Sequence, residues 1–225
     1  MTLARRALAE GLGSLLLTAA VIGSGIMAER LAGGNAAIAL LANTGATVAV
    51  LATLIALLAP VSGAHFNPAV TLMMAVRRSL SPGDAGSYVL AQVLGCCAGA
   101  VLAHAMFEMP LLQASTHPRS GIGQYLGEFV ATAGLLVIVL GHRRASDAPW
   151  MIAAWIGAAY WFTSSTSFAN PAITIARSLT DSFSGIRPLD VPAFVAAQVA
   201  GACAGAAIGR LIPDSTPHQR NQPSR

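Results

Sequence analysis

Six long apolar stretches, separated by short polar segments, dominate the pattern of hydrophobic and polar positions along this chain. Each is near the ~20 residues that a helix needs to cross a bilayer, with the fourth and fifth at the short end. Because lipid offers backbone groups no hydrogen-bond partner, such segments must be helices. The predicted spans are residues 7–27, 36–58, 88–107, 125–141, 150–165 and 191–212.

The composition supports the same class of protein. Of the 225 residues, 55% are hydrophobic and only 10% are charged, whereas an ordinary soluble domain is about 25% charged. The formal net charge of +4 is one reason to consider nucleic-acid binding. However, all 13 basic residues are arginines that are spread along the chain without interleaved aromatic residues, so we expect no nucleic-acid partner.

The first apolar stretch could also be interpreted as a secretory signal peptide. Arg5 and Arg6 fit the positively charged start of such a signal. Glu10 lies inside the apolar run, however, and no clear small-x-small cleavage site follows it. These features favour a retained membrane span.

The arginines predict the orientation of the chain in the membrane. With six spans, nine arginines fall on one side and four on the other, and three arginine pairs lie on the richer side. Cytoplasmic loops carry the excess of positive charge, so both termini are predicted to be cytoplasmic, in a multi-pass protein of the cell (inner) membrane. Residues 213–225 are rich in Pro, Gln, Ser and Arg and are predicted to be a disordered tail. The richer side holds Arg5, Arg6, Arg77, Arg78, Arg143, Arg144, Arg210, Arg220 and Arg225; the other holds Arg30, Arg119, Arg177 and Arg187.

The chain repeats itself. Residues 91–100 (AQVLGCCAGA) and 197–206 (AQVAGACAGA) are identical at eight of ten positions. Upstream of each lies another match, HFNPAVTL at 65–72 and FANPAITI at 168–175. A recurring order of landmarks predicts two structural repeats within one domain.

The repeats are predicted to be inverted. Ala9-Glu10 in the first span corresponds to Gly127-Glu128 in the fourth, which extends the repeats to about 7–107 and 124–212. Three spans per repeat is an odd number, so the second repeat must enter the membrane from the opposite side. Equivalent residues of the two repeats then meet near the middle of the membrane.

An Asn-Pro-Ala motif in each repeat predicts a re-entrant half-helix, because the apolar run around it is too short to span. Asparagine is a favourable N-cap, and proline is favoured at the first helical position. A helix that begins at membrane depth is tolerated only where it lines a cavity or is buried in protein. The two motifs are Asn67-Pro68-Ala69 and Asn170-Pro171-Ala172.

Two such half-helices predict a selective pore. Their N-termini would bring two positive dipole ends together at the midplane, and the two asparagine amides would donate hydrogen bonds to a passing oxygen. Cations and protons would meet a positive electrostatic barrier, whereas small neutral solutes would pass.

The paired Asn-Pro-Ala loops, the segment SGAHFNPAVT at 62–71 and the intramembrane glutamates together resemble the aquaporin (major intrinsic protein) family over residues 7–212. The resemblance implies an all-α membrane protein of six transmembrane helices plus two re-entrant half-helices, arranged as one channel domain over residues 1–225. It also implies a homotetramer in which each protomer holds its own pore, and no cofactor or metal. Glu10 and Glu128 would accept hydrogen bonds from the loop backbone and hold the loops in shape.

The sequence departs from the family pattern at the outer filter. Most members carry an arginine directly after the second Asn-Pro-Ala, but this chain carries Ile173 there. The family's spacing, counted without gaps, places the other filter positions at Thr47, Ala158 and Ser167. A filter without a large, aromatic or charged residue would be wide, which disfavours strict water selectivity. The pattern is similar to bacterial aquaglyceroporin variants associated with arsenic resistance, so the expected permeants are glycerol-like polyols and neutral hydroxides such as arsenite, As(OH)₃, together with water.

Two further residues are candidates for the pore. Arg177 lies seven residues after Asn170, which is ~10 Å further outward on a helix. It either supplies the missing positive charge in the outer vestibule or anchors the half-helix to extracellular loops or headgroups. His65 is expected to line the cytoplasmic half of the pore, where a pH gate is an alternative role.

The sequence disfavours an enzyme, and a water-selective aquaporin and an ion-coupled secondary transporter are the alternatives. An enzyme would need a nucleophile elbow or a phosphate loop, and the sequence contains neither. An ion-coupled secondary transporter would also use inverted repeats, but it needs acidic residues near the substrate. Only Glu10 and Glu128 are available for that coupling.

Overall fold

The computed structural model describes residues 1–142 and 144–211, and among them it contains helices and no strand. Arg143, the last residue of the sixth predicted span and the predicted tail at 213–225 lie outside the described residues. The helices are α1 (Leu3–Leu31), α2 (Ala36–Ser62), α3 (Pro68–Val76), α4 (Pro82–Met106), α5 (Ile122–Gly141), α6 (Ala148–Phe162), α7 (Pro171–Arg177), the 3₁₀ turn η1 (Pro188–Asp190) and α8 (Val191–Gly209).

The six predicted spans correspond to α1, α2, α4, α5, α6 and α8. Five of these helices are long and apolar enough to cross a membrane, and α6, with 15 residues, is shorter. The two short helices α3 and α7 each begin at an Asn-Pro pair. The predicted all-α architecture of six spans and two half-helices is therefore observed.

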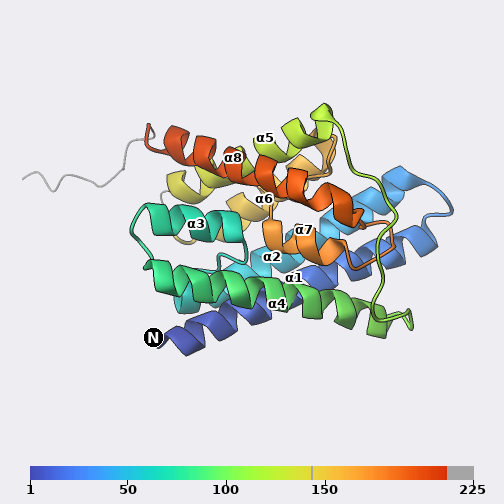
Figure 1. Cartoon of the computed structure of the whole chain (residues 1–225), viewed down its shortest axis with the longest axis horizontal. Coiled ribbons are helices and arrows are strands. Elements are labelled where there is room, and N and C mark those ends of the chain that lie inside the picture. Colours follow the sequence, from blue (N-terminus) through green and yellow to red (C-terminus); the bar gives the residue numbers. More distant parts are fainter. Residues whose placement is uncertain (143, 212–225) are drawn as a thin grey trace, which may run out of the picture.

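The half-helices occupy the centre of the bundle. In Figure 1, α3 and α7 lie between the α1–α4 pair and the α5–α8 pair, and they contact each other as well as α4 and α8. The start of α1 and the end of α8 lie at the same end of the bundle. The two repeats thus enclose the two loops that carry the motifs.

Small residues let the long helices of each repeat pack closely. A Cβ atom at Gly95 would clash with the carbonyl oxygen of Gly11 on α1, and one at Gly201 would clash with that of Phe129 on α5. In lipid, such close backbone approach is what holds helices together, since there is no hydrophobic drive between them. The α1–α4 and α5–α8 contacts are therefore two copies of one packing arrangement.

We expect Gly205→Ala to destabilise the protein, because its Cβ would clash with the carbonyl oxygen of Ala133. Overpacking of this kind costs about 1–3 kcal/mol. Gly45→Ala is the matched control, because Gly45 lies within α2 with open space around it and gains about 0.5–1 kcal/mol from the better helix former. Thermal unfolding in detergent measures both variants, and equal melting temperatures would contradict the packing argument.

Candidate functional site

Each half-helix begins with an asparagine that caps it. The Asn67 Oδ1 accepts a hydrogen bond from the Ala69 N–H (2.9 Å), and the Asn170 Oδ1 accepts from the Ala172 N–H (3.0 Å). Each proline occupies the first helical turn, where its missing N–H costs nothing. The side-chain oxygens are thus used locally, which leaves the amide nitrogens for other partners.

Those amide nitrogens link the two loops across the molecule. The Asn67 Nδ2 donates to the Ala169 carbonyl and the Asn170 Nδ2 donates to the Phe66 carbonyl, both at 2.7 Å. Each asparagine therefore holds the backbone just before the opposite motif. Since an amide NH₂ group carries two hydrogens, each side chain has a second N–H after this bond is made.

The loops before the motifs adopt a strained backbone at equivalent positions. Ala64 and Phe66 have φ of 51° and 48°, and their counterparts 103 residues later, Ser167 and Ala169, both have φ of 48°. A non-glycine residue in this left-handed region costs about 1–3 kcal/mol. Such loops persist only where surrounding groups over-determine them.

The two intramembrane glutamates supply that support, and both are fully buried. Glu10 accepts from the backbone N–H groups of His65 (3.0 Å) and Phe66 (2.7 Å). Glu128 accepts from those of Phe168 and Ala169, both at 2.8 Å. Each carboxylate thus fixes the strained residues directly before an Asn-Pro-Ala motif.

A glutamine completes the same network in each repeat. Gln92 donates to Glu10 (2.8 Å), and Gln198 donates to Glu128 (2.6 Å). The same amide groups also donate to threonines on the half-helices, Thr71 and Thr174 respectively. The Ala-Gln landmarks that revealed the repeat are therefore part of the loop scaffold, a role that the sequence analysis did not assign to them.

A cavity of about 250 Å³ runs past the tips of both half-helices. Asn67 and Asn170 line it, together with mostly apolar side chains from α2, α5 and α6. His65 also lines it, with its Nδ1 3.1 Å from the Thr71 hydroxyl. Apolar members of the wall include Leu51, Ile55, Val70, Leu135, Val139 and Ile156.

Three of the four expected filter positions, Thr47, Ser167 and Ile173, line this cavity, but Ala158 does not. Ala158 is exposed on the outer face of α6, so its assignment to the filter is wrong. Each residue turns an α-helix by about 100°, so a counting error of two residues moves a side chain to nearly the opposite face. Tyr160 lines the cavity instead, and its hydroxyl donates to Thr47 Oγ1 at 3.5 Å.

The cavity wall also contains an aromatic and a charged side chain that the counted filter positions leave out. Tyr160 brings an aromatic ring, and Arg177 also lines the cavity with only 3% of its surface exposed. Helical spacing could have indicated both residues, because Tyr160 follows Ile156 by four positions and Arg177 follows Ile173 by four. Residues four apart share one face of a helix.

Arg177 is anchored as well as facing the cavity. Its Nε donates to the Ser184 carbonyl in the loop after α7, and its Cζ lies 3.4 Å from the centroid of the Phe168 ring. Arg177 is therefore held by the loop that follows α7.

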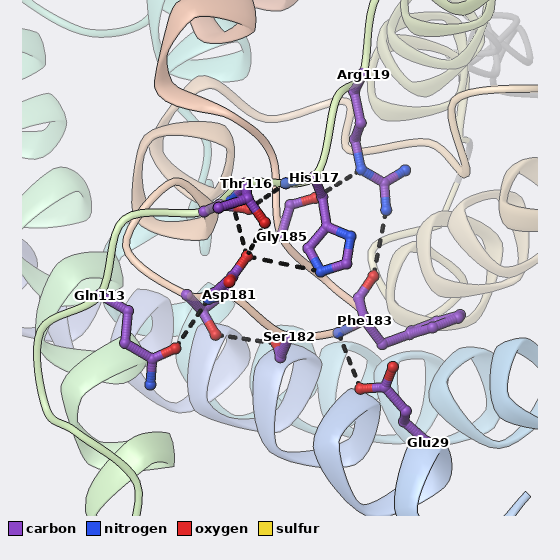
Figure 2. Close-up of polar contacts among 11 residues, drawn as sticks. Glu29, Gln113, Thr116, His117, Arg119, Asp181, Ser182, Phe183 and Gly185 are labelled. Carbon is purple, nitrogen blue, oxygen red and sulfur yellow. Dashed lines mark hydrogen bonds and ion pairs between the residues drawn. The ribbon is translucent and has the colours of Figure 1, made fainter.

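The loop before α5 is hydrogen-bonded to that same loop. The Asp181 carboxylate accepts from the backbone N–H (2.7 Å) and hydroxyl (2.9 Å) of Thr116, and these bonds lower its pKa. Gln113 accepts from the Asp181 N–H, and Glu29 of α1 accepts from the Phe183 N–H. Figure 2 shows these contacts converging on the segment that follows α7.

This arrangement defines a class of protein: a membrane pore of two inverted repeats whose half-helices meet tip to tip. Residues 1–161 match the major intrinsic protein family. The chain belongs to that family, and it is therefore a multi-pass membrane protein of a channel family.

Three similar proteins illustrate the relationship. The aquaglyceroporin AqpS of Rhizobium meliloti (strain 1021) is 51% identical over 214 residues, which cover 93% of this chain and 91% of that protein. Aquaporin A of Dictyostelium discoideum is 35% identical over 185 residues, or 76% of this chain and 66% of that protein. The structure of the aquaglyceroporin from Plasmodium falciparum matches with a TM-score of 0.68 over 96% of this chain and 97% of that one. Its 17% sequence identity shows a shared fold alone.

We expect Glu128→Gln to lower both the stability and the conductance of the protein. A glutamine presents one oxygen in place of two, so a buried backbone N–H loses its acceptor, at a cost of about 1–3 kcal/mol. Glu108→Gln is the control, because Glu108 is exposed beyond the end of α4. Thermal unfolding and solute flux in proteoliposomes test the pair, and a Glu128→Gln variant that behaves like Glu108→Gln would refute the holding role.

Proposed function

We propose that this protein is a passive channel for small neutral hydroxylated solutes, with glycerol-like polyols and neutral metalloid hydroxides such as arsenite as permeants, together with water. One observation carries the proposal: Asn67 and Asn170 meet in a cavity whose other walls are mostly apolar. The printed name of the 51% identical relative, an aquaglyceroporin, supports the same solute class.

The chemistry of the lining fits such solutes. A permeating hydroxyl oxygen accepts hydrogen bonds from the second N–H of each asparagine, while the carbon skeleton lies against side chains such as Val70 and Leu135. The N-termini of two half-helices disfavour cations at the same point.

A water-selective channel and an ion-coupled transporter are both less well supported. A water-selective channel would not need the many apolar side chains that line this cavity. An ion-coupled transporter needs a carboxylate that can bind and release an ion, and both intramembrane glutamates are fully buried. Glu10 accepts four hydrogen bonds and Glu128 accepts three, so each is committed to the loops.

We also propose the finer features of the assembly. Both termini face the cytoplasm at the cell (inner) membrane, in keeping with the arginine distribution, and four copies form a homotetramer with one pore in each. Accessibility of an N-terminal tag in intact and permeabilised cells tests the orientation, and cross-linking in membranes tests the oligomeric state.

We expect wild-type proteoliposomes to take up glycerol and arsenite at rates that rise linearly with solute concentration. A pore without a rate-limiting conformational step shows such linear flux, whereas a carrier saturates. Stopped-flow light scattering measures glycerol and water, and arsenic content of the vesicles measures arsenite. Water flux without either solute would contradict the proposal, as would uptake that depends on an ion gradient.

We expect Asn170→Ala to reduce glycerol flux at least tenfold, because it removes one of the two central donors. Asn35→Ala is the matched control: Asn35 caps α2 in the same way, through hydrogen bonds from Ala37 and Ile38, but does not line the cavity. Both variants lose an N-cap worth about 1 kcal/mol. Equal glycerol flux in the two variants would show that the amide is not part of the pore.

A further inference from the structure

The two half-helices end in different surroundings. The segment that follows α7 is held by another part of the chain: the Ser178 carbonyl accepts a hydrogen bond from the Ser115 N–H (3.0 Å), and the Asp181 carboxylate accepts two from Thr116. Figure 2 shows the loop before α5 lying against this segment. The end of α7 is therefore covered by protein.

The corresponding segment after α3 has no such cover. Residues 77–81 correspond to 180–184, which lie 103 positions later. Within the part of the chain that the structure describes, the hydrogen bonds of this first segment stay among residues 73–85. Arg77 is exposed, whereas its counterpart Thr180 is fully buried. The repeats thus differ in what surrounds the end of each half-helix.

Two arginines occupy this uncovered end. The guanidinium groups of Arg77 and Arg78 form no ion pair with any described residue, and both side chains are exposed. Asp84 follows closely in the sequence, but its carboxylate pairs with Arg6 at 2.6 Å. Neighbouring arginines that are not neutralised attract anions, and the planar guanidinium group matches the geometry of a phosphate.

Arg78 occupies a position where glycine is the favoured residue. Its φ is 60°, in the left-handed region. It ends α3 in a Schellman motif, in which the Arg78 N–H donates to the Ala75 carbonyl (2.9 Å) and the Ser79 N–H donates to the Met74 carbonyl (3.0 Å). An arginine is less stable than glycine in this conformation. Strained positions of this kind are concentrated at functional sites.

An exposed apolar face leads up to the two arginines. Leu72 and Val76 of α3 are 41% and 59% exposed, and residues four apart share one face of a helix. Their counterparts Ile175 and Leu179 are partly buried. In Figure 1, α3 lies between α4 and α8, and its connection to α4 lies at the end of the bundle that carries the N-terminus. We call Leu72, Val76, Arg77 and Arg78 the α3 patch.

We propose that the α3 patch binds an anionic phospholipid, with the phosphate at Arg77 and Arg78 and an acyl chain along Leu72 and Val76. A lipid matches this order of chemistry, because its charged headgroup lies at the membrane surface and its apolar chains lie deeper. A soluble anion would use the arginines alone. A second copy of the chain would bring a further pair of positive charges to the patch.

The leaflet follows from the orientation proposed above. With both termini in the cytoplasm, the α3 patch lies in the cytoplasmic leaflet, where anionic lipids attract basic segments. The bound lipid braces the last turn of α3. That turn includes Met74, which lines the cavity and whose carbonyl accepts from the Ser79 N–H (3.0 Å) and hydroxyl (2.9 Å).

The test measures thermal unfolding of the full-length protein in nanodiscs of phosphatidylcholine, with and without added phosphatidylglycerol. We expect the anionic lipid to raise the melting temperature of the wild-type protein by about 2–4 °C. Arg77→Gln is expected to lose at least half of this rise, and the double variant Arg77→Gln/Arg78→Gly to lose all of it. A wild-type protein with the same melting temperature in both lipids would overturn the proposal.

Two further variants separate the lipid contact from other effects. Arg144→Gln is the matched control, because it removes one exposed arginine at the same end of the bundle, after α5, where Leu140 contacts Gly209 of α8. We expect it to keep the full rise. Arg78→Gly relieves the left-handed backbone, so it is expected to melt at or above the wild-type temperature in phosphatidylcholine and still lose most of the rise.

The remaining outcomes are also decisive. An Arg144→Gln variant that loses as much of the rise as Arg77→Gln would show general attraction between charges and refute a specific site. A double variant that keeps the rise but changes its oligomeric state in both lipids would assign the patch to a contact between copies. A wild-type protein that shows the rise but conducts no neutral solute refutes the proposed channel and supports the lipid site.

Discussion

The structure depends on two buried carboxylates that accept hydrogen bonds from the backbone of the re-entrant loops. A buried charge is costly unless it is well hydrogen-bonded, and Glu10 and Glu128 meet this condition with four and three donors. The loops in turn contain left-handed residues that would not persist alone. The cost of burying the charge and the cost of the strained backbone offset each other. The carboxylate needs hydrogen-bond donors, and the left-handed loop presents its backbone N–H groups to it.

This shared scaffold brings the asparagines together. Each loop ends in an asparagine that caps its own half-helix and also donates to the carbonyl before the other motif. The two loops are therefore mutually dependent, and a shift of one would remove a hydrogen bond from the other. Because both asparagine oxygens are engaged as caps, the groups that remain for a solute are N–H donors.

The two repeats share a scaffold but differ where they line the cavity. His65 of the first repeat corresponds to Phe168 of the second, and Met74 corresponds to Arg177. The hydrogen-bonded glutamates and glutamines are the same in both. Pseudo-symmetry thus builds a stable passage, while the side chains that break the symmetry give its two ends different chemistry.

The sequence by itself determined the spans, the repeat and the half-helices. These features follow from local rules: hydrophobic length, N-cap and proline chemistry, and the identity of equivalent residues at a fixed offset. The cavity wall around the expected filter positions was different, because its residues come from α2, α6, α7 and a loop that meet only in the folded chain. Counting along the sequence selected Ala158, but the rotation of α6 places Tyr160 in the cavity. Likewise, only the tertiary contacts with Ser184 and Phe168 decided that Arg177 faces the passage, since a long flexible side chain takes its direction from what surrounds it.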